Sequence, residues 1–151
     1  MTSNPDIVFV RRADNSDHVV IQKHLAASRA EALEYRGSVL PVSEQPDDIY
    51  LVAGVGETVF GSLTLSRKGE NEWFIAHVFV EKDAREIGVG DALVLHALSV
   101  LREKNATWIG AQAQPGDRAL KNLFERHGLV AQTILVGRGL SDPSTEVDAS
   151  Q

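Results

Sequence analysis

The residues best suited to chemistry in this 151-residue sequence are the two glycines of the stretch REIGVG, which runs from Arg85 to Gly90. An apolar run precedes this stretch and a longer one follows it, so the pattern predicts that the glycines open a helix. Glycine lets backbone N–H groups at the positive end of a helix dipole come close to an anion. The spacing therefore predicts a phosphate-binding loop.

Three phosphate-binding motifs place glycines in this way. A P-loop is excluded, because the sequence contains no Gly-Lys-Ser/Thr. A dinucleotide-binding fingerprint needs a third glycine where Leu93 stands and an acid about 20 residues later, but the stretch TWIGAQAQ holds no acid. The remaining motif is the pyrophosphate loop of acyl-CoA N-acyltransferases, Arg/Gln-x-x-Gly-x-Gly/Ala, which residues 85–90 match.

His77 is the most interesting candidate for a general base, since an imidazole titrates near neutral pH. On a regular strand it shares a face with Ile75 and Phe79. The other face carries Val78 and Val80, so only a bulge makes both faces relevant to one site. Catalysis and a partly buried structural role are the two alternatives for this histidine.

The elements that must position these residues follow from periodicity and turn signals. Strands are expected at residues 7–13, 49–54, 58–67, 72–82, 107–114 and 130–140. The first helix starts after a cap at residues 15–17 and ends at Gly37, and its core face is expected to carry Ile21, Leu25, Ala26, Ala30 and Leu33. Further helices are expected at residues 92–101 and after the turn PGD. The stretch 37–48 is a connector or an acceptor-binding lid.

Composition narrows the function classes. A net charge of −6 argues against binding to a nucleic-acid backbone and weakly favours cationic small substrates. The absence of cysteine excludes disulfides and thiolate chemistry, and the histidines lack the spacing of metal ligands, so no metal site is expected. No segment has the length of a membrane span or the pattern of a secretion signal, which predicts a cytoplasmic protein without a membrane partner. Residues 1–140 are expected to form one domain, and residues 141–151 a disordered acidic tail.

Two motifs give the sequence its resemblance to the GNAT acetyltransferase superfamily, from Ile7 to Leu140. The stretch VFVEKDAREIGVGDALV looks like the fourth strand and cofactor loop of that family, and PGDRALKNLFERHGL resembles its fifth-strand exit and following helix. The resemblance implies an α/β (α+β) fold with a central mixed, mostly antiparallel sheet flanked by helices. It also implies that the fourth strand is bulged and splays from the fifth.

The resemblance further implies transfer of an acetyl group from acetyl-CoA to an amine, by direct attack and without a covalent enzyme intermediate. The acceptor is a small-molecule or protein amine, and a homodimer is compatible with the family. In relatives a base often lies in the fourth strand, which makes His77 the catalytic candidate. The residues expected to bind the cofactor are Val78, Val80, Arg85, Glu86, Ile87, Gly88, Val89, Gly90, Asp91 and Asn122.

One departure from the family pattern concerns the leaving group. Phe124 stands where many relatives have a tyrosine that protonates the departing thiolate. A thiol titrates near ~8.5, so the thiolate leaves without this donor, although more slowly. Glu31, Glu34 and Tyr35 are candidates to face the acceptor. The alternative from another class is a non-catalytic acyl-CoA-binding or protein-interaction domain that kept the fold.

Overall fold

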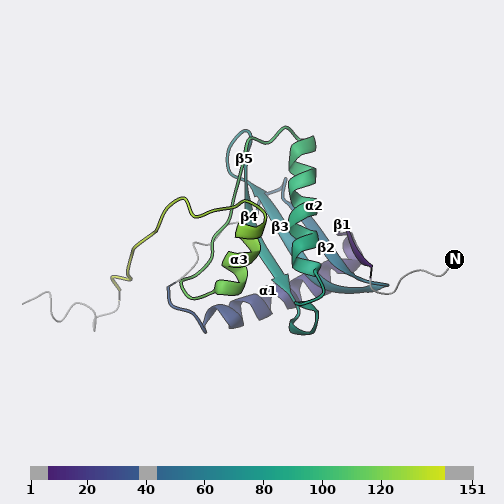
Figure 1. The fold of residues 1–151 in the computed structure, drawn as a ribbon, viewed down its shortest axis with the longest axis horizontal. Helices are drawn as coiled ribbons and strands as arrows, with labels where there is room; N and C mark the ends of the chain where they lie inside the picture. Colours follow the sequence, from purple (N-terminus) through teal and green to yellow (C-terminus); the bar gives the residue numbers. More distant parts are fainter. Residues whose placement is uncertain (1–6, 38–43, 142–151) are drawn as a thin grey trace, which may run out of the picture.

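Five strands form one sheet in the computed structural model, which describes residues 7–37 and 44–141 (Figure 1). The order is β1-β2-β3-β4-β5, and β5 runs parallel to β4 while the other neighbours are antiparallel. The expected mixed, mostly antiparallel sheet is therefore confirmed. The strands are β1 (Val8–Arg12), β2 (Ile49–Val55), β3 (Thr58–Arg67), β4 (Glu72–Val80) and β5 (Trp108–Gly110).

Helix α2 (Val89–Glu103) covers one face of the sheet and forms the apolar core with it. Its buried side chains pack on alternate residues of the central strands, as the apolar run in the sequence predicts. The helix comes very close to β3 at Gly61, where an added Cβ would lie 2.8 Å from Val89 Cγ1. The α2 residues in the core are Val89, Leu93, Val94, Ala97 and Leu101.

Helix α1 (His18–Ala32) covers the opposite face, which is polar at its centre. A short 3-10 turn (Asn15–Asp17) leads into it, with Asp14 as the N-cap of the turn. The expected core face of α1 is wrong in part: Ile21 is buried, but Leu33 is 88% exposed. Instead, the fully buried side chain of the second turn is His24, because the β3 face beneath it carries hydroxyl groups that pair with an imidazole.

Helix α3 (Arg118–Arg126) packs beside the start of α2, and a 3-10 turn (Lys82–Ala84) links β4 to the glycine stretch. The Asp117 side chain caps α3 by accepting from Leu120 N. Gly128 follows the helix with a φ of +85°, the left-handed conformation in which a glycine often ends a helix. Leu123 and Phe124 are the buried residues of α3.

Of the two strands predicted at the C-terminal end, one is shorter than expected and the other is absent. The fifth strand forms but is only three residues long, and beyond it the side-chain amide of Gln114 donates to the carbonyls of Ala32 and Gly37 near the end of α1. Residues 130–140 form no strand, and in Figure 1 the segment leads away from the sheet. Their sequence favours a strand, but a strand also needs a paired neighbour. Half of the expected lid (residues 38–43) and nearly all of the expected disordered tail (residues 142–151) lie outside the described residues.

Within the described ranges, no helix has the length and apolar character that crossing a membrane requires. The same ranges contain no group of three or more acidic or histidine side chains arranged to hold a metal ion.

Candidate active site

A β-bulge in β4 decides where His77 points. Leu65 of β3 pairs with Ile75, but the next residue, Thr64, pairs with His77, so β4 carries one extra residue at Ala76. The bulge reverses the alternation of side chains, and His77 therefore lies on the α1 face while Ile75 lies on the α2 face. The parity expected for a regular strand, with both residues on one face, is wrong for this reason.

Beyond the bulge, β4 has an unpaired edge. β5 pairs with β4 only from Glu72 to Phe74, so the strands part before the bulge. On the other side Glu81 N donates to Phe60 O, and the alternating pattern of an antiparallel ladder then turns the backbone groups of Val78 and Val80 away from β3. These groups face the opening between β4 and the chain that follows β5, as the resemblance implies.

The two glycines that open α2 have different structural roles. Gly88 is the N-cap of the helix with a φ of +88°, a conformation that other residues rarely adopt, and an added Cβ would touch nothing. Gly90 allows close packing, because a Cβ there would lie 3.4 Å from Leu123 Cδ2 and 3.6 Å from Val80 Cγ2. The first N–H groups of α2, from Val89 onward, lack partners within the helix and remain available to an anion.

The charged residues around this loop are paired. Arg85 makes a two-point ion pair with Glu31 of α1 at 2.8 and 2.6 Å, and its Nε donates to Val80 O. The hydrogen bonds from Arg85 lower the pKa of Glu31. Asp91 accepts hydrogen bonds from Arg126 and His127. Burial raises the pKa of Asp91, but these two bonds outweigh that effect, so the pKa lies below its ordinary value. The acid beside the loop is thus neutralised by α3.

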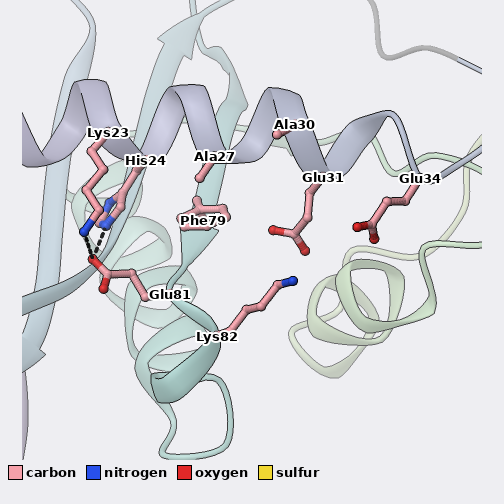
Figure 2. A pocket seen from close by; sticks show the side chains of 9 residues that line it. All are labelled: Lys23, His24, Ala27, Ala30, Glu31, Glu34, Phe79, Glu81 and Lys82. Atoms are coloured by element: carbon pink, nitrogen blue, oxygen red, sulfur yellow. Dashed lines mark hydrogen bonds and ion pairs between the residues drawn. The ribbon is translucent and has the colours of Figure 1, made fainter.

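A cavity of about 340 Å³ lies between α1 and the end of β4 (Figure 2). Its charged side chains come from α1, from Glu34 just after it and from the segment after β4, and they lie around the ring of Phe79. Three carboxylates face two lysines there, and this small excess of negative charge suits the binding of a cationic amine. The lining residues are Lys23, His24, Ala27, Ala30, Glu31, Glu34, Phe79, Glu81 and Lys82.

A buried chain of hydrogen bonds connects this cavity to His77. Glu81 Oε2 lies 2.8 Å from His24 Nε2, and His24 Nδ1 lies 2.9 Å from Ser62 Oγ. The same hydroxyl lies 3.3 Å from His77 Nε2. Burial, together with the charges of His24 and Arg29, lowers the pKa of His77 from 6.5 to about 4, so this imidazole is neutral at pH 7.

The remaining predicted residues lie in different surroundings. Tyr35 follows the end of α1, where the negative charges of Asp117, Glu31 and Glu34 raise its pKa. Asn122 and Glu86 are exposed, and Ile87 is half exposed. Phe124 belongs to the apolar core. The predicted cofactor residues of β4 and of the glycine loop thus lie on one continuous segment, residues 78–91. Asn122 lies apart from them and is exposed on α3.

Sequence reasoning missed three members of the buried chain: His24, Ser62 and Glu81. Their signal is weak, because they are 57 residues apart at most and have no fixed spacing. A usable clue is that β3 carries hydroxyl residues at every second position from Ser62 to Ser66. A strand with one hydroxyl-bearing face predicts a polar partner on the helix that covers it.

A model of the acetyltransferase (GNAT) family matches residues 14–129. The chain belongs to the GNAT family. The match includes the bulged strand, the glycine loop and α3, so the resemblance expected from the two sequence motifs is confirmed. No curated protein matches the sequence.

Solved structures share the GNAT fold at low identity. An aminoglycoside acetyltransferase from an uncultured soil metagenomic sample, in complex with sisomicin, has a TM-score of 0.66 at 17% identity and covers 89% of this chain and 97% of its own. AAC(6')-Iy with the bisubstrate analog CoA-S-monomethyl-acetylneamine has a TM-score of 0.66 at 12% identity, with 88% and 98% covered. The ribosomal-protein-alanine N-acetyltransferase from Brucella melitensis biovar Abortus 2308 has a TM-score of 0.66 at 18% identity, with 90% and 99% covered.

Proposed function

We propose that this GNAT-family chain transfers an acetyl group from acetyl-CoA to a primary amine, without a covalent enzyme intermediate. The observation that supports this most is the parting of β4 from β5 after Phe74, beside the helix start at Gly88. The free edge offers the backbone groups of Val78 and the N–H of Val80 to the extended pantetheine arm, as an added strand would use them, while Val80 O accepts from Arg85 Nε. The N–H groups at the start of α2 hold the pyrophosphate.

In this proposal Val78 N–H also donates to the thioester carbonyl, where negative charge develops during attack. The pyrophosphate contacts come from the loop residues 85–91, and the exposed Asn122 of α3 remains a proposed further contact to the cofactor. The Arg85 guanidinium is already bound by Glu31 and Val80 O. It therefore adds charge to the phosphate site only after it leaves Glu31.

The amine approaches from the α1 side, where the cavity carries Glu31, Glu34 and Glu81. A protonated amine is drawn to these carboxylates and must lose a proton before it attacks. His77 is the residue proposed to take that proton. Its side chain projects on the α1 face next to Val78, and its Nδ1 bonds no described residue.

The proposal is tested by titrating the purified chain with acetyl-CoA in a calorimeter and then measuring thiol release with three amines. The amines are sisomicin, spermidine and a peptide that begins with alanine, which represent a drug-like amine, a polyamine and a protein amine. Binding in the micromolar range together with thiol release from at least one amine is the expected result. An absence of binding at millimolar acetyl-CoA would contradict the proposal.

A second candidate function is a non-catalytic acyl-CoA-binding domain. It is favoured by Phe124, which is buried in the core and has no proton to donate, and by the low pKa of His77. The same experiment separates the two functions: a binding domain takes up acetyl-CoA but releases no thiol with any amine.

A further inference from the structure

Two buried polar groups near His77, the side chains of His24 and Ser62, have no role in the function proposed above, and hydrogen bonds link them to Glu81 in the cavity. His24 is completely buried, Ser62 is 2% exposed, and the Glu81 side chain is 28% exposed at the cavity. Burying an imidazole and a carboxylate is costly unless both are hydrogen-bonded. Here each group bonds the next, in an unbroken line from His77 to the cavity.

We propose that Ser62, His24 and Glu81 form a proton relay that carries the proton accepted by His77 to the cavity between α1 and the end of β4. The inference rests on the proposed function, in which His77 takes a proton from the amine. It adds a route by which that proton leaves a site where bulk water has little access. The three residues act on the amine proton through His77, and of these three His24 and Glu81 also line the cavity.

The hydrogen bonds fix a direction for the relay. Glu81 as a carboxylate only accepts, so His24 Nε2 carries the proton of that bond. When the relay is ready to act, the other nitrogen of His24, Nδ1, accepts from the Ser62 hydroxyl, and the Ser62 oxygen in turn accepts from His77 Nε2. This arrangement leaves His77 Nδ1 as an acceptor with no described partner, ready for the proton of the amine.

Each transfer in the relay balances. The amine proton binds His77 Nδ1, and the proton on His77 Nε2 moves to Ser62 Oγ. The Ser62 hydroxyl proton moves to His24 Nδ1, and the proton on His24 Nε2 moves to Glu81 Oε2, from which it passes to water. His77, Ser62 and His24 each gain one proton and lose one, and no bond between heavy atoms changes.

The relay explains how a weak base serves this reaction. A base is most effective when its pKa lies near the working pH, and His77 alone falls well below it. Because His77 passes the proton to Ser62 at once, it can serve as the base without a pKa near the working pH. The charge ends on a carboxylate that reaches solvent and that Lys23 approaches within 4.0 Å.

The first test uses histidine-labelled protein and ¹⁵N NMR at pH 7, and requires no turnover. His77 is expected as the neutral Nε2–H tautomer, and His24 is expected to carry a proton on Nε2; the signals are assigned with His24→Gln and His77→Gln. Ser62→Ala removes the central link and should shift the signals of both rings. An Nδ1–H tautomer of His77 would overturn the relay, because that nitrogen would then be unable to accept a proton.

The second test measures thiol release with the best amine of the panel. Glu81→Gln keeps the size of the side chain and an acceptor for His24 but removes the carboxylate, and Ser62→Ala breaks the line. Both variants should lower kcat about tenfold or more, since one link contributes part of the roughly 10²- to 10⁴-fold effect of acid–base catalysis. Both should leave the KM for acetyl-CoA unchanged. The matched control is Glu103→Gln, which removes an exposed carboxylate at the far end of α2 and should equal the wild type.

A solvent isotope effect distinguishes the relay from a structural role. The wild type should show a curved dependence of kcat on deuterium content, because several protons move together, and Glu81→Gln should not. Equal kcat in wild type, Glu81→Gln and Ser62→Ala would overturn the relay while leaving acetyl transfer intact. If the wild type does not bind acetyl-CoA, the proposed function fails first.

Discussion

At the scale of single residues, the site depends on a few polar groups that the fold holds away from water. The neutral state of His77 results from burial on the α1 face, which follows from the bulge at Ala76. The type of residue and its place in a strand are visible in the sequence, but the bulge is not. The role of His77 as a candidate base could therefore be predicted, whereas its partners Ser62 and His24 could not.

The low pKa of His77 predicts a dependence of stability on pH. Unfolded His77 binds a proton below about pH 6.5, but folded His77 does so only near pH 4, so the free energy of unfolding falls across this window by roughly 3 kcal/mol. His77→Gln should remove this loss. Urea denaturation at pH 7 and pH 4.5 measures it, and an equal loss in both proteins would show that His77 is not the cause.

Because Glu31 holds Arg85 in an ion pair, we expect Glu31 and the phosphates of acetyl-CoA to compete for the Arg85 guanidinium. Glu31→Gln frees Arg85 and should tighten the binding of acetyl-CoA a few-fold, whereas Arg85→Gln should weaken it, because phosphate prefers a charged fork. Calorimetry with acetyl-CoA measures both changes. If Arg85→Gln binds as well as the wild type, Arg85 serves only to hold Val80 O and Glu31.

At the scale of elements, local signals predict some parts well and others poorly. The hairpin of β2 and β3 and helix α2 follow from alternation and from a long apolar run, and both are confirmed. The buried face of α1 is mispredicted, since its alanines and Leu33 suggest a core that the polar β3 surface does not offer. Which face a weakly amphipathic helix buries depends on its partner, and the partner is set by sheet register.

Helix α2 approaches β3 so closely at Gly61 that a larger residue would disturb the packing. Gly61→Ala would bring a Cβ to 2.8 Å from Val89 Cγ1 and 3.2 Å from Leu93 Cδ1, so it should destabilise the protein by about 1–3 kcal/mol through overpacking. Chemical denaturation measures this loss. Gly137→Ala is the control, because a Cβ there meets nothing within 4 Å. Equal stability of the two variants would mean that α2 shifts without cost.

At the scale of the whole molecule, family and fold could be predicted because the glycine loop and the α3 motif are local and keep their order along the chain. One domain over residues 1–140 stays a prediction. The strand predicted at residues 130–140 does not form. Whether a segment pairs with the edge of a sheet depends on residues far away in the chain, and the local sequence pattern does not show it. In the structure this C-terminal segment carries large apolar side chains that solvent reaches: Val130, Ile134, Leu135, Val136 and Leu140.

This exposed segment predicts self-association, in agreement with the homodimer that the family allows. A run of exposed apolar residues marks an interface, and β5 at the sheet edge offers unpaired backbone groups. Sedimentation should show a dimer whose population rises with concentration. A chain that ends at Leu129, or one with Ile134, Leu135 and Val136 replaced by serine, should remain monomeric. A wild type that is monomeric at all concentrations would contradict this.

The central claim, that the glycine loop holds the pyrophosphate of acetyl-CoA, is tested most directly by calorimetry on two variants of Gly88. Asn and Asp both tolerate a positive φ and have the same size, so they differ only in charge. Gly88→Asn should still bind acetyl-CoA, whereas Gly88→Asp should lose binding while keeping its fold by circular dichroism. Equal acetyl-CoA affinity in the two variants would contradict the account, since a charge at the helix start would then not meet the phosphates.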